Sequence, residues 1–508
     1  MAERQVDIAV YGATAGGAMA AIAAAGEGRR VLLIEPGRHV GGMVSGGLGW
    51  TDRGETVDVI GGLARRFHER VWARYGVEPW GVRGPEPHVA EAILRDWLSE
   101  AGVEIAFDAS LAGVEKAGRS IRRVATAGGE SIAATVFIDA SYEGDLLAAA
   151  GVGYAVGRES RSLHGESWAG RQPIRPDQHQ FAVPVSPFRE GMEAPLPLVH
   201  DQPMVPEGDG DGGVQSYCYR LCLTDRPDIR VPFPEPGECD PAAFELVRRW
   251  LVAMGDRIHV NRMFSLSGRL PNGKVDANSI GPISTNLPDG SSWRYPDAGR
   301  AEREAIRLHH LRYTQGLMWF LANDPDTPAH IRTEMGRWGL CADEFADTGH
   351  WPHQLYVRDA RRMLGEYVLT QHDLERGRAH HDAVGMGVYN IDIREVQRTW
   401  MPVPRYPLMR PETFNEGYLS APVAPYQIPY RALLPRWDEC DNLLVPVCLS
   451  ASHVAFASVR MEPQYMLLGH AAGVAAALAV GASQAVHRVD IGALQRRLRD
   501  QGQRLAAR

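Results

Sequence analysis

The sequence has 508 residues, of which 44% are hydrophobic and 23% charged, and its formal net charge is −8. This composition is that of an ordinary globular protein and excludes the disordered and fibrous classes. The negative charge and the lack of any basic run argue against a nucleic-acid partner. At roughly 150 residues per domain, the length predicts two or three structural units.

The cysteines predict neither a disulfide framework nor a metal site, because no two of them form a CxxC pair. Free thiols in a reducing cytoplasm are the simplest interpretation. The first residues lead into a strand without a basic segment and apolar stretch, so we expect no secretion signal. The most apolar late segment, 465–480, is shorter than the roughly 20 residues that span a bilayer, which predicts a buried helix and no membrane partner. The cysteines are Cys218, Cys222, Cys239, Cys341, Cys440 and Cys448.

The beginning of the chain predicts a βαβ unit. Residues 6–11 form a short apolar strand, 16–26 an alanine-rich helix and 30–34 a second strand. After a glycine-rich loop, helical periodicity occupies 62–75 and 89–98. The pattern then becomes extended, with strands expected at 103–107, 111–114, 121–126 and 132–138.

The middle of the chain differs in composition from the first part. It is rich in proline, aromatic residues and long helical stretches such as 300–321, without a second nucleotide signature. The end resembles the beginning, with an apolar strand at 443–447, a long helix ending near 480 and an amphipathic helix at 491–500. We therefore expect an α/β fold in which a Rossmann-like domain is interrupted by an inserted α+β substrate or cap domain. The expected parts are 1–156 and 426–508 for the first domain and 157–425 for the inserted domain.

The loop after the first strand has the character of a dinucleotide-binding loop. Gly12 permits a tight turn, Gly17 lets the helix approach the sheet, and Thr14 stands where the second glycine of the pattern usually lies. The loop, which includes Gly16, lies between strand and helix, so its amides can receive a pyrophosphate. Glu35 ends the next strand and can accept hydrogen bonds from ribose hydroxyls. The alternative is a glycine-rich turn in an unrelated α/β protein.

FAD is favoured over NAD because the chain does not continue with further βαβ repeats. Five blocks spread over the chain resemble the FAD-dependent oxidoreductase family of xanthan-lyase-like flavoproteins. This resemblance implies a glutathione-reductase-type FAD domain and a distant relation to fumarate-reductase-like flavoproteins. The blocks are IEPGRHVGGMVSGGLGWTD, FIDASYEGDLLAAAGV, LPNGKVDANS, YVRDARRMLGEY and SASHVAFASVRMEPQYMLLGHAAGVAAALA.

The resemblance also implies cofactor-binding residues outside the first loop. The backbone at Gly41, Gly42 and Met43 would pass beside the pyrophosphate towards the isoalloxazine, and Val114 would lie near the adenine. We expect the FAD to be held without a covalent bond, although His39 lies close to this loop.

Two later blocks would complete the FAD site by the same resemblance. Asp139 matches the second FAD motif, and Asp145 opens the next helix, where a simple N-cap role is an equal alternative. Arg460, Met461 and Glu462 would precede a helix whose N-terminus faces the flavin.

Candidates for substrate chemistry are His453 and the polar run with Lys274 and Asn278. His453 is predicted to be the acid or base, because imidazole titrates near neutral pH and the residue lies in the block expected to face the flavin. Structural roles remain the alternative for His453 and Lys274. Arg358, like Arg361 and Arg362, is expected to form ordinary ion pairs, with binding of an anionic substrate or FAD phosphate as the alternative.

We expect a hydride to pass between a carbon of a small molecule and flavin N5. An alcohol of a sugar, glycoside or polyol-like substrate is the first choice, and the electron acceptor is unidentified. The alternatives are a carbon–carbon dehydrogenase or reductase of the fumarate-reductase-like type, and a flavin-binding protein without turnover.

Overall fold

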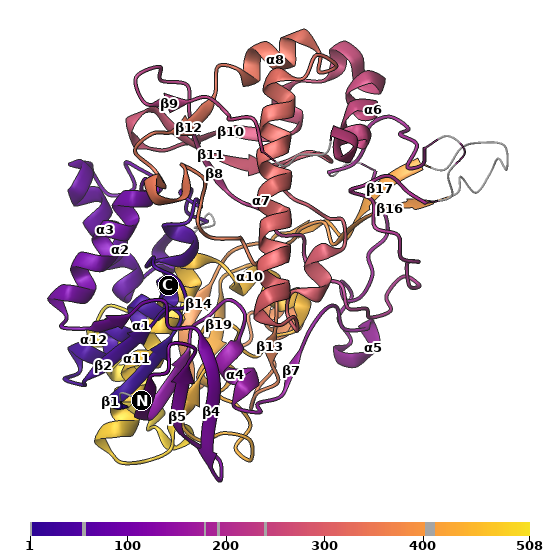
Figure 1. The fold of residues 1–508 in the computed structure, drawn as a ribbon. Helices are drawn as coiled ribbons and strands as arrows, with labels where there is room; N and C mark the ends of the chain where they lie inside the picture. Colours follow the sequence, from indigo (N-terminus) through magenta and orange to yellow (C-terminus); the bar gives the residue numbers. More distant parts are fainter. Residues whose placement is uncertain are drawn as a thin grey trace.

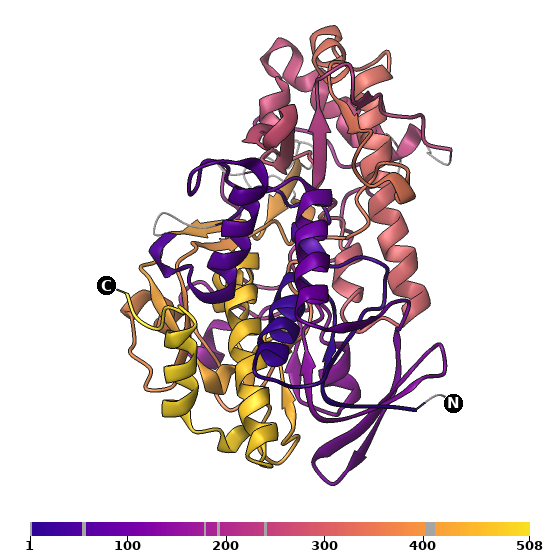
Figure 2. The same ribbon diagram turned by 90° about the vertical axis from the view of Figure 1, so that its left-hand side faces the viewer.

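The computed structural model describes residues 3–52, 57–176, 179–189, 191, 194–237, 241–401 and 412–507. The chain builds two connected layers, with the first and last segments side by side in the lower part and the middle segment above them (Figures 1 and 2). The five cysteines in the described part are buried and free. Cys239 lies outside the described residues.

The lower layer is built on a mixed sheet of seven strands. Its central strands run parallel, and a hairpin adds two antiparallel strands at one edge. The last strand, β20 (Leu443–Leu444), pairs in parallel with the sixth. In spatial order the other strands are β3 (Glu104–Ala106), β2 (Val31–Ile34), β1 (Glu3–Tyr11), β6 (Ser131–Asp139), β5 (Ser120–Thr126) and β4 (Leu111–Ala117). This arrangement confirms the α/β, Rossmann-like fold class.

Helices from both ends of the chain cover one face of this sheet (Figure 1). The two innermost helices, α1 (Ala15–Gly26) and α11 (Glu462–Gly481), pack closely because small residues face each other. A Cβ on Gly469 would overlap the carbonyl of Gly16, and one on Gly473 would overlap that of Ala20. The outer helices are α2 (Gly62–Tyr75), α3 (Pro87–Glu100) and α12 (Ile491–Asp500).

The packing of α11 also shows whether this apolar helix is a core helix or a candidate membrane span. Among the described residues it is the one helix long and apolar enough to cross a bilayer by length and composition, and 83% of its most apolar window is buried inside the protein. Such burial is typical of a core helix, as the sequence predicted.

The upper layer contains a five-stranded antiparallel sheet with the long helix α7 (Arg300–Asn323) beside it (Figure 1). In spatial order its strands are β10 (Phe264–Arg269), β11 (Lys274–Ser279), β8 (Leu221–Thr224), β12 (Gly339–Cys341) and β9 (Arg230–Val231). The other helices of the middle segment are α5 (Arg161–His164), α6 (Glu245–Met254), α8 (Ala329–Met335) and α9 (Gln371–Arg376).

Short strand pairs join the two layers. One pair, β14 (Ala383–Gly387) with β19 (Tyr426–Pro429), links the middle segment to the returning one, and β14 packs against α11. The domain boundaries at 156 and 425 stay a prediction. The other short strands are β7 (Tyr154–Ala155), β13 (Arg362–Met363), β15 (Ile391–Ile393), β18 (Leu419–Ala421), β16 (Gln397–Met401) and β17 (Glu412–Glu416), and two helices remain, α4 (Asp145–Ala149) and α10 (His453–Val459).

Most predicted elements differ from the observed ones by a few residues at their ends. Three strands differ by three residues at one end: the strands expected at 6–11 and 111–114 are longer, and the strand expected at 443–447 ends at Leu444. The amide of Val445 donates to the carbonyl of Leu433 instead of continuing the sheet.

Candidate active site and cofactor site

A cavity of about 710 Å³ opens at the carboxyl ends of β1 and β2. Gly12 and Thr14 follow β1, Glu35 follows β2, and all three line the cavity. Ligands of Rossmann-like sheets bind at this end of the strands. The cavity volume is in the range of roughly 300–1,000 Å³ that is typical of ligand sites.

The loop from Gly12 to Gly17 has the geometry of a phosphate-binding turn. Gly12 has a φ of +94°, and a Cβ there would overlap the backbone of Ser141. The hydroxyl of Thr14 donates to the carbonyl of Ala140 (2.8 Å) and accepts from the amide of Gly17 (3.1 Å), so Thr14 caps α1. The start of α1 is thereby fixed beside the cavity, where its amides and dipole favour an anion.

The two remaining glycines of this loop serve packing. A Cβ on Gly17 would overlap the carbonyl of Gly12, and a Cβ on Gly16 would press on the carbonyl of Tyr465 in α11. Neither glycine is among the residues that line the cavity. Their contribution to cofactor binding is therefore to let the turn and the two helices approach.

The carboxylate of Glu35 is held in a position where it can accept hydrogen bonds from a ribose. Its two carboxylate oxygens accept from the amides of Ala13 and Gly37, both at 2.7 Å, and burial raises its pKa. Each oxygen keeps a second lone pair that a ribose hydroxyl can use. The turn, the helix start and this carboxylate fit the pyrophosphate and ribose of a dinucleotide.

The segment Gly41–Met43 lies next to this turn. The amide of Gly41 donates to the carbonyl of Ala13 (2.7 Å), and Gly41 has a φ of +108°. The amide of Met43 donates to the hydroxyl of Tyr142, which donates in turn to Glu462 (2.6 Å). Gly42 is needed here, because a Cβ would overlap that hydroxyl. Burial raises the pKa of Glu462 to about 8.

The other residues implied by the resemblance take different positions. Val114 does not line the cavity, whose wall reaches the neighbouring Gly113. Asp139 is fully buried and does not reach the cavity either: it accepts from the amide of Ser141 (3.1 Å) and from that of Leu147 (2.8 Å), so it shapes the following turn. Burial raises the pKa of Asp139 to about 6.

Asp145 lines the cavity as the first residue of α4. The N-cap of that helix is Gly144, so the alternative N-cap role for Asp145 is wrong. Its carboxylate pairs with Arg303 (2.8 Å) and Arg361 (2.9 Å), two arginines that also line the cavity.

Both ring nitrogens of His39 are engaged. Nδ1 lies 3.1 Å from Glu91 and Nε2 lies 3.1 Å from Asp347, and the ring stacks on His353 with 3.7 Å between centroids. His39 therefore has protein partners on both nitrogens, and the lack of a covalent link to FAD stays a prediction.

A second cavity, of about 190 Å³, lies where the middle segment meets the start of α11. We call it the polar cavity, because only Met461 in its wall is apolar. Of the predicted residues, Asn278, Arg358, Arg460 and Met461 line it. The complete wall is Asp52, Arg220, Asn278, Tyr356, Arg358, Tyr389, Asn390, Asp392, Arg394, Tyr418, Ser420, Arg460 and Met461.

Glu462 lines a third, mostly apolar cavity, with Pro463 and Met466 of α11. Asp52 lines both this cavity and the polar cavity. Arg460 and Met461 thus line the polar cavity and Glu462 lines the apolar one, and their place beside the flavin stays a prediction.

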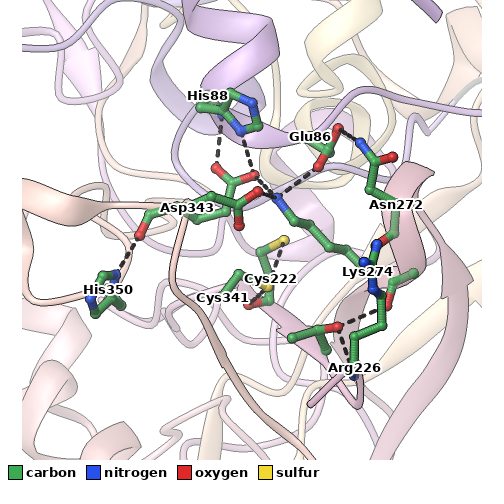
Figure 3. A network of polar contacts seen from close by, with 12 residues as sticks. Glu86, His88, Cys222, Arg226, Asn272, Lys274, Cys341, Asp343 and His350 are labelled. Carbon is green, nitrogen blue, oxygen red and sulfur yellow. Dashed lines mark hydrogen bonds and ion pairs between the residues drawn. The ribbon is translucent and has the colours of Figure 1, made fainter. Parts of the chain in front are cut away.

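Lys274 does not reach either space. Its ammonium lies among three carboxylates: Glu86 at 2.7 Å, Asp343 at 2.8 Å and Glu344 at 2.7 Å. Figure 3 shows the ammonium with Glu86 and Asp343. The side chain is fully buried at the start of β11. Burial by itself lowers the pKa of Lys274, but the charges of Glu344 and its neighbours raise it above its ordinary value. An ammonium held in this way is a poor proton donor near neutral pH, which favours the structural interpretation.

His453 is buried at the first position of α10, and it is not part of the polar cavity wall. Its Nε2 lies 3.1 Å from Asp359, and its amide donates to Glu159 (2.9 Å). Asp359 adjoins Arg358, which does line the cavity. His453 therefore does not line the polar cavity, and its catalytic role stays a prediction.

Sequence reasoning missed the pair of Asp52 and Tyr389. The Tyr389 hydroxyl donates to Asp52 Oδ1 at 3.3 Å, and both line the polar cavity. Burial raises the pKa of Asp52, and the charge of Arg220 partly offsets this. Asp52 ends the first quoted block of resemblance, so its position was a usable signal, whereas Tyr389 and Arg394 lie in no block.

Comparisons with known proteins agree on the family. Residues 7–498 match the family described as FAD dependent oxidoreductase. No curated protein sequence is a significant match.

Two solved structures illustrate the remote similarity. L-amino acid deaminase from Proteus vulgaris is 16% identical, with 27% of this chain and 53% of that chain covered and a TM-score of 0.22. A flavoprotein/dehydrogenase from Cytophaga hutchinsonii is 18% identical, with 29% and 42% covered and a TM-score of 0.22. The chain thus matches about half or less of the length of these structures, and such scores support no conclusion about substrate.

The family match covers nearly the whole chain and favours an oxidoreductase over a flavin-binding protein without turnover. The residues at the ends of β1 and β2 fit the dinucleotide that this family uses. The chain belongs to the FAD dependent oxidoreductase family, whose cofactor is FAD.

Proposed function

We propose that the enzyme oxidises an alcohol carbon of a sugar, glycoside or polyol-like substrate that binds in the polar cavity. Bound FAD supplies a hydride acceptor in such reactions. The observation that carries the proposal is the wall of this cavity, which is polar at every residue except Met461.

The character of the wall suits a hydroxylated substrate. Asn278, Asn390 and Ser420 offer neutral donors and acceptors, and Tyr356 and Tyr418 add hydroxyls and ring faces. The volume of about 190 Å³ is below the roughly 300–1,000 Å³ of pockets for drug-sized ligands, which favours a small substrate.

Oxidation of an alcohol also requires a proton acceptor. Asp52 can take the hydroxyl proton directly or through Tyr389, whose hydroxyl already donates to it. A raised pKa places the carboxyl of Asp52 nearer to the working pH, where general bases are efficient. We assign the proton transfer to Asp52, and His453 then holds Asp359.

The alternative is oxidation or reduction of a carbon–carbon bond. The guanidinium of Arg460 lines the cavity and donates to the hydroxyl of Tyr356 (3.1 Å), so a polar donor is present for that chemistry too. Together with alcohol oxidation, we propose a cytoplasmic location and an electron acceptor whose identity is open.

The test is anaerobic mixing of the oxidised, FAD-loaded enzyme with sugars, polyols and saturated acids, and of the reduced enzyme with enoates. Loss of the yellow flavin colour with an alcohol donor supports the proposal, and Asp52→Asn should slow it by about 10²- to 10⁴-fold. The exposed Asp438→Asn is the matched control and should reduce at the wild-type rate. If the colour is lost only with saturated acids that yield enoates, or if the reduced enzyme reacts only with enoates, the alternative holds.

A further inference from the structure

The wall of the polar cavity is rich in arginine. Four guanidinium groups and only two carboxylates line it. The arginines are Arg220, Arg358, Arg394 and Arg460, and the carboxylates are Asp52 and Asp392.

Three of these arginines have carboxylate partners. Arg220 makes a two-point ion pair with Asp276, at 2.9 Å and 2.7 Å, so its charge is neutralised within the protein. Arg394 and Arg460 lie 3.9 Å and 3.7 Å from the same carboxylate, that of Asp392. Two positive charges thus share one negative charge.

Arg358 is different, because its partners are neutral. Its guanidinium donates to the carbonyl of Ser216, to Cys218 Sγ (3.2 Å) and to Asn286 Oδ1 (2.9 Å). The group lies over the ring of Tyr356, 4.5 Å from the centroid, and Arg358 is only 2% exposed. No carboxylate in the described part of the chain lies within ion-pair distance of it.

A buried guanidinium without a counterion is costly, since burial removes water that is not replaced by a negative charge. The three bonds to neutral groups use three of the five N–H donors of Arg358 and leave two. The two that remain, Nε–H and one Nη1–H, point in different directions, so a carboxylate oxygen would accept from one of them in a single charge-assisted hydrogen bond.

We propose that the polar cavity recognises a carboxylate-bearing substrate, a sugar acid or similar polyhydroxy carboxylate, whose carboxylate pairs with Arg358. Arg394 and Arg460, which share Asp392, supply the rest of the positive field. The alcohol end of the same molecule then lies on the side of Asp52 and Tyr389. The inference rests on the proposed function only for that alcohol end.

The experiment measures binding separately from turnover. The oxidised, FAD-loaded enzyme is titrated with D-glucuronate, D-galacturonate and D-gluconate, and with the neutral D-glucose, D-galactose and sorbitol, while the flavin absorbance spectrum is recorded. At least one acid should perturb the spectrum saturably, with an affinity at least ten times that of its neutral counterpart. Equal affinity for acids and neutral sugars, or no response to any acid, overturns the inference.

Variants locate the effect. Arg358→Gln should lower the affinity for the acid at least tenfold and leave that for the neutral sugar unchanged, whereas Arg358→Lys should keep part of the preference. The exposed Arg436→Gln is the matched control, with no change expected. If Arg358→Gln does not take up FAD, Arg394→Gln carries the same test with a smaller expected loss. An unchanged preference for the acid in a folded Arg358→Gln enzyme contradicts the inference.

Two further outcomes have definite meanings. Inorganic phosphate that binds as tightly as the acid, and competes with it, would show a general anion site and overturn recognition of a carboxylate. Acid binding without flavin reduction by any alcohol would support the inference while refuting the proposed function. Flavin reduction by neutral sugars with the same KM as by acids would support the proposed function and refute the recognition of a carboxylate.

Discussion

Replacing Lys274 with methionine should destabilise the protein without impairing its chemistry. The ammonium of Lys274 lies 2.7–2.8 Å from three carboxylates, and two of these, Glu86 and Glu344, have side chains that are 1% exposed. The variant removes the one group that contacts all three carboxylates and leaves His88, 2.7 Å from Glu344, as the remaining possible cation. Loss of one partner of a buried ion pair costs about 3–5 kcal/mol in comparable sites, and His88 can offset part of this. At about 2 cal/mol/K of unfolding entropy per residue, the full cost lowers the Tm of a chain this long by about 3–5 °C.

The assay is thermal unfolding of the FAD-loaded protein, followed by circular dichroism at one scan rate. Lys116→Met is the matched control, because Lys116 is the other lysine of the sequence and donates only to carbonyls, those of Ala150 and Glu439. The difference in Tm between Lys274→Met and the wild type should decrease at acidic pH, because protonation of the carboxyl groups that have lost the ammonium removes their repulsion. An unchanged Tm together with flavin reduction slowed by about 10²-fold or more would refute this reasoning and make Lys274 a catalytic group.

The remaining predictions concern the cofactor and the proton. Glu35→Ala should weaken FAD binding by about 1–3 kcal/mol, as for lost charged hydrogen bonds, measured by titrating the apoprotein; unchanged affinity would place the ribose elsewhere. Because Asp52 acts as a base and its pKa is raised by burial, anaerobic flavin reduction should rise with pH through that raised pKa and then level off. Asp52→Asn should abolish this rise of the reduction rate with pH. If the rise persists in the variant, another group is the base. His453→Ala should keep FAD and slow flavin reduction by less than about tenfold, whereas a direct acid–base role requires about 10²- to 10⁴-fold.

The FAD half of the molecule could be predicted from local sequence, because its geometry is set by local rules. Gly12 is required by a positive φ, Thr14 by the cap of α1 and Glu35 by its place after a strand. Even the deviation at Thr14 has a local reason, since its side chain both caps the helix and reaches the carbonyl of Ala140.

The polar cavity could be predicted only in part, because it is assembled from segments far apart in the chain. Asp52 and Tyr389 are separated by more than three hundred residues and meet through a single hydrogen bond. Lys274 and Asn278 lie four residues apart in one polar run, but β11 carries Lys274 to the carboxylate cluster and Asn278 to the cavity. The surroundings that β11 meets in the folded protein, and not the local sequence, decide that one residue is structural and the other lines the cavity.

The central claim is that the polar cavity holds the substrate during flavin reduction. Its most direct test is anaerobic flavin reduction by an alcohol donor in a Ser420→Phe variant, which fills the cavity from β18. The exposed Ser267→Phe serves as the matched control. We predict that the Ser420→Phe enzyme binds FAD normally but is no longer reduced by the donor, while the control is reduced at the wild-type rate. Wild-type reduction of the Ser420→Phe enzyme would contradict the assignment of this cavity to the substrate.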